Sequence, residues 1–211
     1  MKKVAISVHA TDDFSLELIK GLKEFDYIHV DIMDGKFVDT QSNNLNVLKL
    51  LQEKHDIPII THLMVVNPLE YFPKISDYCD IIIFHYESGG NREKLINNIK
   101  SFSKKVGIAI NPDTKLETIL PFLNKIDLVL IMSVYPGKSG QEFIWEVLDK
   151  LNLLIGYRHQ NKLEFQIDID GGINTENCKF IHADILTSAS SILKSQDPNS
   201  VIKSLKYSDE K

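Results

Sequence analysis

Two stretches of the sequence carry polar side chains where a buried strand would be apolar. In residues 27–32, apolar residues alternate with His29 and Asp31, so the imidazole and the carboxylate share one face of a predicted strand. The same alternation places Asp168 and Asp170 on one face of a later predicted strand. Burying a carboxylate is costly unless something compensates its charge. These positions are therefore candidates for chemistry.

A second histidine, His62, lies near the end of another predicted strand. If these strands end at one mouth of a barrel, His29, Asp31, His62 and Asp170 converge and form a site for one divalent metal ion per chain. Mixed nitrogen and oxygen ligation suits Zn²⁺, Fe²⁺, Mn²⁺ or Co²⁺ and does not distinguish them. The alternative is a hydrogen-bonded His29–Asp31 pair beside a core histidine, but joint placement at three strand ends favours the metal. His85 also ends a strand, without a carboxylate neighbour in the pattern, so we expect it behind the site or as a satisfied core histidine.

The elements that position these residues are short β-branched runs alternating with amphipathic stretches. Apolar residues three and four apart predict helices within residues 14–22, 95–102 and 143–155. Repeated βα units of this length predict a (β/α)8 TIM barrel, a single domain over residues 1–211. An open doubly wound sheet is the alternative, disfavoured because no GxGxxG turn opens the chain. The expected strands are residues 4–8, 27–32, 58–64, 80–85, 106–110, 128–133, 164–169 and 185–188.

Composition narrows the class of protein. The 211 residues carry 24 Lys and Arg against 29 Asp and Glu, a net charge of −5, which argues against a nucleic-acid partner or an anionic membrane surface. The two cysteines, Cys79 and Cys178, form neither a disulfide framework nor a zinc knuckle. No apolar run is long enough for a membrane helix, and the start lacks the apolar stretch of a signal peptide. We expect a cytoplasmic protein.

Glycine and other small residues follow the last two predicted strands. Gly171 and Gly172 come directly after Asp170, and residues 187–191 are threonine, serine and alanine. In a barrel, the loops after strands seven and eight commonly hold a phosphate group through backbone N–H groups. A plain turn is the alternative interpretation of residues 170–172. A helix N-cap at Ser188 or Ser190 is compatible with a bound phosphate, because both use the same exposed backbone N–H groups.

Apart from Met1, the methionines all lie at predicted strand ends, at Met33, Met64 and Met132. Methionine commonly fills gaps in a core. Three at one barrel mouth favour an apolar cover over polar chemistry, with the glycine-containing loop 135–141 able to close above it.

At this point the sequence resembles the ribulose-phosphate 3-epimerase family. The resemblance runs from about Ser7 to Leu193, and its motifs are specific in combination. They are residues 29–38 (HVDIMDGKFV), 62–65 (HLMV), 107–112 (GIAINP), 132–137 (MSVYPG) with Gly140 and Gln141, and 168–173 (DIDGGI). The resemblance implies a barrel enzyme that inverts C3 of a ketopentose 5-phosphate, interconverting D-ribulose 5-phosphate and D-xylulose 5-phosphate through an enediolate.

The resemblance also implies roles for individual residues. His29, Asp31, His62 and Asp170 would ligate the metal, and Asp31 and Asp170 would double as the acid/base pair. The substrate and its phosphate would be held by Ser7, His62, Met33, Met64, Met132, Gly137, Lys138, Ser139, Gly140, Gly171, Gly172, Ala189 and Ser190. We expect a small ketose phosphate as the substrate and a homo-oligomeric assembly.

Several positions depart from the family pattern without removing a metal ligand or a catalytic carboxylate. Residues 135–140 read YPGKSG where the family usually has NPGFGG, and Ala189 replaces a glycine. A ketohexose phosphate such as D-allulose 6-phosphate is therefore an alternative substrate, and a non-catalytic phosphosugar-binding barrel is an alternative function. A decarboxylase or an aldolase on a similar barrel would require a strand lysine, and the strand residues named above include none.

Overall fold

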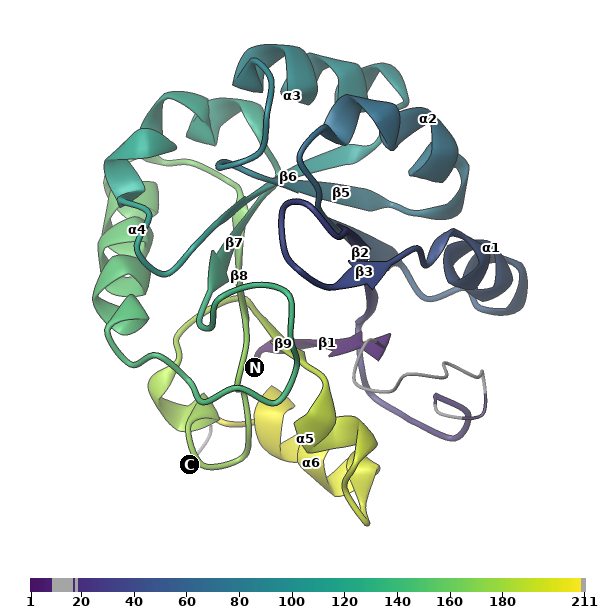
Figure 1. The fold of residues 1–211 in the computed structure, drawn as a ribbon. Coiled ribbons are helices and arrows are strands. Elements are labelled where there is room, and N and C mark those ends of the chain that lie inside the picture. The colour runs from purple at the N-terminus through teal and green to yellow at the C-terminus, as the bar shows by residue number, and fades with distance from the viewer. Residues whose placement is uncertain (9–16, 18, 210–211) are drawn as a thin grey trace.

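The computed structural model describes residues 1–8, 17 and 19–209 and forms a closed parallel barrel surrounded by helices (Figure 1). Within those residues, eight parallel strands pair in a ring, and β1 pairs with both β2 and β9. This closure confirms the TIM barrel and excludes an open doubly wound sheet. The ring consists of β1 (Lys3–Ser7), β2 (Tyr27–Asp34), β4 (Ile59–Met64), β5 (Ile81–His85), β6 (Lys105–Ile110), β7 (Leu128–Met132), β8 (Gln166–Asp170) and β9 (Ile185–Ser188).

The expected strands are all present, with ends displaced by no more than two residues. The sequence did not predict β3 (Gln41–Ser42), which pairs antiparallel with the end of β2. Two polar residues carry no periodicity from which a strand could be predicted. Because β3 pairs with Met33 and Asp34, the last two residues of β2, it holds the loop between the two strands at the end of β2.

Helices of very different length cover the outside of the barrel. The expected helix over residues 95–102 is confirmed by α3, whereas α4 begins only at Val147, so Phe143 lies in the loop before it. Of the expected helix over residues 14–22, residues 14–16 and 18 lie outside the described residues, and residues 19–21 form a turn. The α-helices are α1 (Leu45–Lys54), α2 (Phe72–Ile75), α3 (Arg92–Ser101), α4 (Val147–Asn161), α5 (Ser190–Leu193) and α6 (Pro198–Lys206), and the 3-10 helices are η3 (Pro68–Glu70), η4 (Ser76–Tyr78), η5 (Leu116–Thr118), η6 (Leu120–Lys125) and η7 (Cys178–Phe180).

The barrel strands separate two apolar layers. Outward-facing residues such as Ile28 and Val30 pack beneath the helices in the larger core. A smaller core fills the barrel axis and includes Tyr27, Ile83 and Leu130. Alternation therefore directs His29 and Asp31 to the interior, as expected, because they share the face of Tyr27. The interior is mainly apolar below the mouth, although Gln166 and Asp168 of β8 share its inward face with Leu128 and Leu130.

A repeated aspartate fixes the register at the opposite end of the barrel. An aspartate stands directly before β2, β5, β7 and β9. Its side chain accepts a hydrogen bond from the backbone N–H of the first or second residue of the preceding barrel strand. Its own backbone N–H donates to the carbonyl of that same residue. The pairs are Asp26 with Val4, Asp80 with Ile59, Asp127 with Val106 and Asp184 with Ile167. These bonds stabilise the barrel away from the mouth.

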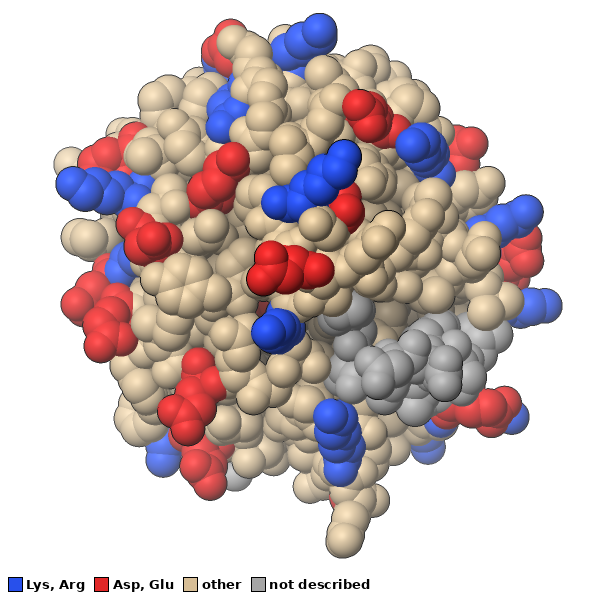
Figure 2. Space-filling model, in the orientation of Figure 1, with Lys and Arg blue, Asp and Glu red and all other residues tan. Residues whose placement is uncertain are grey.

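On the face seen in Figure 2, acidic and basic side chains are interspersed. Across the described ranges, no helix is both long and apolar enough to span a bilayer.

The hydrogen bonds of these aspartates, at the end of the barrel opposite the mouth, should contribute to the free energy of unfolding. The Asp127→Ala variant leaves the Val106 N–H without the acceptor that lies 2.8 Å away, and should lose about 1 kcal/mol of unfolding free energy. Asp127→Asn is the matched control, because its side-chain oxygen can still accept the bond. Chemical denaturation measures both; equal losses in the two variants would contradict this role.

Candidate metal centre

Four ionisable side chains meet at the mouth of the barrel. His29 and Asp31 come from β2, His62 from β4 and Asp170 from β8, and one potential ligand atom of each lies within 4.8 Å of the others. Asp31 Oδ1 lies 3.1 Å from His29 Nε2 and 3.0 Å from His62 Nδ1. His29 Nε2 is also 3.8 Å from Asp170 Oδ2. The structure thus brings together the four residues that the sequence predicted as a group.

Strand register explains this convergence. Asp31 and His62 are direct neighbours in the β2–β4 pairing. Asp170 is the last residue of β8, and it lies beside Thr187 of β9. Because the strands are parallel, their C-terminal ends all open to one mouth, where inward side chains share a small volume.

Burial and charge oppose each other in this cluster. Burial lowers the pKa of His29, but the nearby carboxylates Asp31, Asp170 and Asp168 raise it by more, so that it lies at about 9. Burial raises the pKa of Asp31, yet His29 and His62 override burial and hold that pKa well below 3.8. The pKa of Asp170 is raised to about 7. Burial is the largest cause, the Asp31 charge adds to it, and the His29 charge opposes it. Burial lowers the pKa of His62 to about 4 despite its hydrogen bond to Asp31.

This donor set fits a divalent cation. Two imidazole nitrogens and two carboxylate oxygens are the mixed ligands that borderline first-row ions accept, whereas Mg²⁺ and Ca²⁺ prefer oxygen alone. In the absence of a cation, the raised pKa values of His29 and Asp170 favour a proton on each. A bound cation would displace these protons, because metal ligands must be deprotonated. The donors are therefore consistent with Zn²⁺, Fe²⁺, Mn²⁺ or Co²⁺ and do not select among them.

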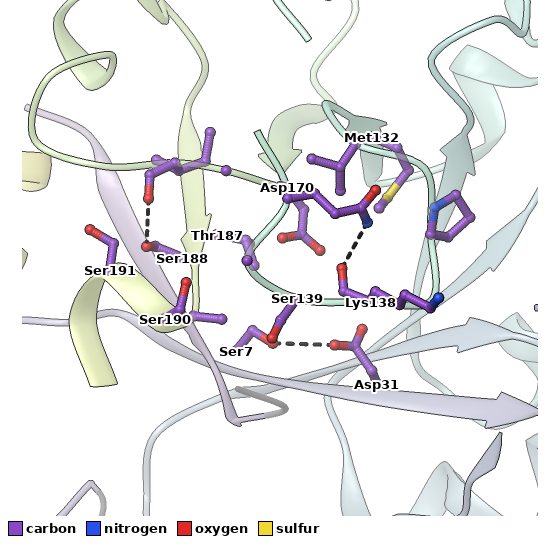
Figure 3. Close-up of a pocket in the computed structure, with 18 of the residues that line it drawn as sticks. Ser7, Asp31, Met132, Lys138, Ser139, Asp170, Thr187, Ser188, Ser190 and Ser191 are labelled. Atoms are coloured by element: carbon purple, nitrogen blue, oxygen red, sulfur yellow. Dashed lines mark hydrogen bonds between the residues drawn. The ribbon is translucent and has the colours of Figure 1, made fainter. Parts of the chain in front are cut away.

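A cavity of about 370 Å³ opens directly above the cluster. Asp31 and Asp170 point into it, and Ser7 donates a hydrogen bond to Asp31 Oδ2 at 3.2 Å (Figure 3). His29 and His62 are fully buried and are not among its lining residues. The lining consists of Ser7, Asp31, Met64, Met132, Val134, Pro136, Gly137, Lys138, Ser139, Gly140, Gln141, Asp170, Gly171, Gly172, Ile173, Asn174, Thr187, Ser188, Ala189, Ser190 and Ser191.

Glycine is required where the wall of this cavity turns after β8. Gly171 has φ of +121°, and a Cβ atom there would lie 2.5 Å from a Val134 methyl carbon. Gly172 has φ of +65°, and a Cβ atom there would lie 2.7 Å from the Phe143 nitrogen. Both positions therefore exclude a side chain and leave backbone exposed to a ligand.

The predicted contact residues divide into two groups. Ser7, Met64, Met132, residues 137–140, both glycines of the turn, Ala189 and Ser190 line the cavity, whereas Met33 and His62 are buried and do not. The N-cap interpretation is wrong, because the Ser188 hydroxyl donates to the Ile173 carbonyl and Ala189 occupies the cap position without a side-chain bond.

The expectation that His85 lacks a carboxylate neighbour is also wrong. His85 Nδ1 lies 3.1 Å from Glu87 Oε2, and His85 Nε2 lies 2.8 Å from His62 Nε2. The sequence contained the signal, since Glu87 follows His85 by two residues, as Asp31 follows His29. Asn174 was missed as well, because it lies beyond the strand in a loop without periodicity.

Comparison with known proteins agrees with this geometry. A sequence model described as the Ribulose-phosphate 3 epimerase family matches residues 3–193. The ribulose-phosphate 3-epimerase of Methanocaldococcus jannaschii is 35% identical, over 98% of this chain and 90% of the relative. That of Schizosaccharomyces pombe is 32% identical, over 98% of this chain and 93% of the relative.

Solved structures share the fold at low sequence identity. 3-Hexulose-6-phosphate synthase from Salmonella typhimurium has a TM-score of 0.71 and 14% identity, over 98% of this chain and 97% of that one. KGPDC from Streptococcus mutans, solved as a ligand complex, has a TM-score of 0.73 and 12% identity, over 98% of this chain and 96% of that one. These likenesses support the barrel architecture.

Metal affinity should rise with pH. Below about 7, both Asp170 and His29 hold a proton that a cation must displace, and between about 7 and about 9 only His29 does. Zn²⁺ affinity should therefore fall as the pH is lowered, most steeply below about 7, with one ion bound per chain. Competition against a chromophoric chelator at several pH values measures this. A pH-independent affinity, or retention of tight binding in His62→Ala, would contradict the assignment of ligands.

Proposed function

The chain belongs to the ribulose-phosphate 3-epimerase family, and we propose that it interconverts D-ribulose 5-phosphate and D-xylulose 5-phosphate by proton transfer at C3. It is an epimerase and hence an isomerase, as are the named relatives. A cavity of about 370 Å³ accommodates a small sugar phosphate. A homo-oligomeric assembly and a cytoplasmic location remain predictions from the sequence.

The single observation that carries this proposal is the pair of carboxylates facing one cavity. Asp31 and Asp170 come from β2 and β8, which β1 and β9 separate in the ring. Both side chains line the same cavity (Figure 3), whereas the buried His29 and His62 do not. Inversion at carbon requires one group that removes a proton from one face and another that returns a proton to the other. Two carboxylates from separate strands meet that requirement.

The two carboxylates have different surroundings in the metal-free cluster. Despite burial, His29 and His62 hold the pKa of Asp31 well below its usual range, whereas burial raises the pKa of Asp170 to about 7. Inversion in one direction uses one carboxylate as the base and the other as the acid, and the reverse reaction exchanges these roles.

The substrate proton is weakly acidic because C3 lies next to the C2 carbonyl. A divalent ion at this centre supplies Lewis-acid stabilisation of the negative charge that develops on the substrate. His29 Nε2 and His62 Nδ1 lie 3.1 and 3.0 Å from Asp31 Oδ1, so these three residues would hold the ion together. Ser7 orients the second oxygen, Asp31 Oδ2, by hydrogen bonding.

We assign the phosphate to the glycine-rich side of the cavity. Gly171 and Gly172 expose backbone there, and residues 137–140 and 188–191 complete the wall. Among the described residues lining the cavity, Lys138 is the one lysine, and it belongs to a loop rather than a strand. This placement supports an epimerase rather than a decarboxylase or aldolase that works through a strand lysine.

Replacing either carboxylate should abolish net epimerisation. Asp31→Asn and Asp170→Asn each keep one competent group on one face, and loss of one proton-transfer group typically costs about 10²–10⁴-fold in rate. Each variant should still exchange the C3 hydrogen of one epimer with D₂O, and the two variants should prefer opposite epimers. NMR of the C3 position measures exchange and inversion separately.

Two controls accompany this experiment, which are the metal content of each variant and the activity of the wild type on two ketose phosphates. Metal content must be measured in each variant, because both residues are proposed ligands. The wild type should turn over D-ribulose 5-phosphate faster than D-allulose 6-phosphate. Substantial inversion by metal-loaded Asp170→Asn would contradict the two-base assignment, and no turnover of either ketose phosphate by the metal-loaded wild type would contradict the epimerase itself.

A further inference from the structure

A row of hydrogen-bonded side chains extends behind His62, away from the cavity. His62 turns Nδ1 toward Asp31 and Nε2 toward His85, whose Nε2 is 2.8 Å away. His85 is fully buried, and its Nδ1 lies 3.1 Å from Glu87 Oε2. Neither His85 nor Glu87 lines the cavity above the metal centre. The row therefore reaches a proposed metal ligand from outside the substrate site.

The far end of the row is a fixed carboxylate. Glu87 Oε1 accepts the Asn111 N–H at 2.9 Å and a hydrogen bond from the Thr114 hydroxyl. Burial raises the pKa of Glu87, but its hydrogen bonds with His85, Asn111 and Thr114 lower it by more, so that it lies at about 2. The carboxylate thus has no proton to donate. The Phe37 ring, with its centroid 4.8 Å from that of His85, covers the middle of the row.

Proton placement along this row has one consistent solution when His62 binds a cation. The nitrogen of His85 that faces the carboxylate must carry a proton, so a singly protonated His85 has its lone pair on Nε2. That lone pair accepts a hydrogen bond only if His62 is protonated at Nε2. His62 then presents an unprotonated Nδ1 toward Asp31 and the metal centre.

We propose that Glu87, acting through His85, is a positioning residue that holds His62 in the Nε2–H form and so directs its Nδ1 lone pair at the metal. Histidine ligands commonly have their second nitrogen bonded to such a partner, which fixes ring orientation and strengthens the ligand. The row serves His62 alone, because His29 Nδ1 has no hydrogen-bond partner among the described residues. The inference rests on the proposed metal centre.

The test compares two substitutions that touch opposite sides of the same carboxylate. Glu87→Gln keeps the size and the acceptor for Asn111 but removes the charge facing His85. Thr114→Val removes a hydrogen bond to Glu87 and leaves that charge in place. Competition with a chromophoric chelator gives the Zn²⁺ affinity of each. Removing such an outer partner should weaken affinity by about 10–100-fold in Glu87→Gln, and by far less in Thr114→Val.

A spectroscopic measurement makes the test independent of how well a variant folds. Ring-nitrogen NMR of the Zn²⁺-loaded wild type should show His85 protonated at Nδ1 alone. Protonation of His85 at Nε2, wild-type affinity in Glu87→Gln, or equal losses in the two variants would overturn the proposal. A wild type that binds no Zn²⁺ would overturn the metal centre as well, whereas a tight wild type with an unaffected Glu87→Gln overturns only this inference.

Discussion

The structure depends on one constraint, which is that four ionisable groups, three of them buried and Asp170 partly buried, lie within 4.8 Å of one another. Isolated charges in such a place would be very unfavourable, so each must be paired, protonated or bound to a cation. Asp31 is the centre of this compensation, because its Oδ1 contacts both histidines and its Oδ2 accepts from Ser7. The same conflict of charges that makes the cluster costly shifts the pKa values of its two carboxylates in opposite directions in the absence of a cation.

The rest of the barrel confines the unfavourable burial of charge to the mouth. The barrel axis is filled by apolar side chains below the mouth, and the outer layer packs under the helices. Four aspartates pin the strand starts at the closed end, far from the cluster. Stability and chemistry thus occupy opposite ends of the same strands, as is usual for this architecture. The loops at the mouth supply the cavity wall, where a side chain on Gly171 or Gly172 would clash with Val134 or Phe143.

Much of this arrangement could be predicted from the sequence because strand periodicity is strict. Alternation in residues 27–32 placed His29 and Asp31 on the inner face, and parallel strand ends brought them to His62 and Asp170. What escaped prediction lies where periodicity ends. The short strand β3 consists of two polar residues without a repeating pattern, and the apolar pattern that includes Phe143 does not show that α4 begins only at Val147. The pairing of His85 with Glu87 had a two-residue spacing as its only signal, just past the last strand residue.

The central claim is that two different carboxylates work on opposite faces of one carbon. The fate of the C3 hydrogen in a single turnover tests it most directly, with metal-loaded enzyme in excess over D-ribulose 5-phosphate that carries deuterium at C3. If Asp31 and Asp170 divide the work, the group that removes the deuteron is not the group that returns a hydrogen. The first D-xylulose 5-phosphate formed should then carry solvent hydrogen at C3. Product that retains deuterium at C3 would show that a single group serves both faces, and would contradict the account.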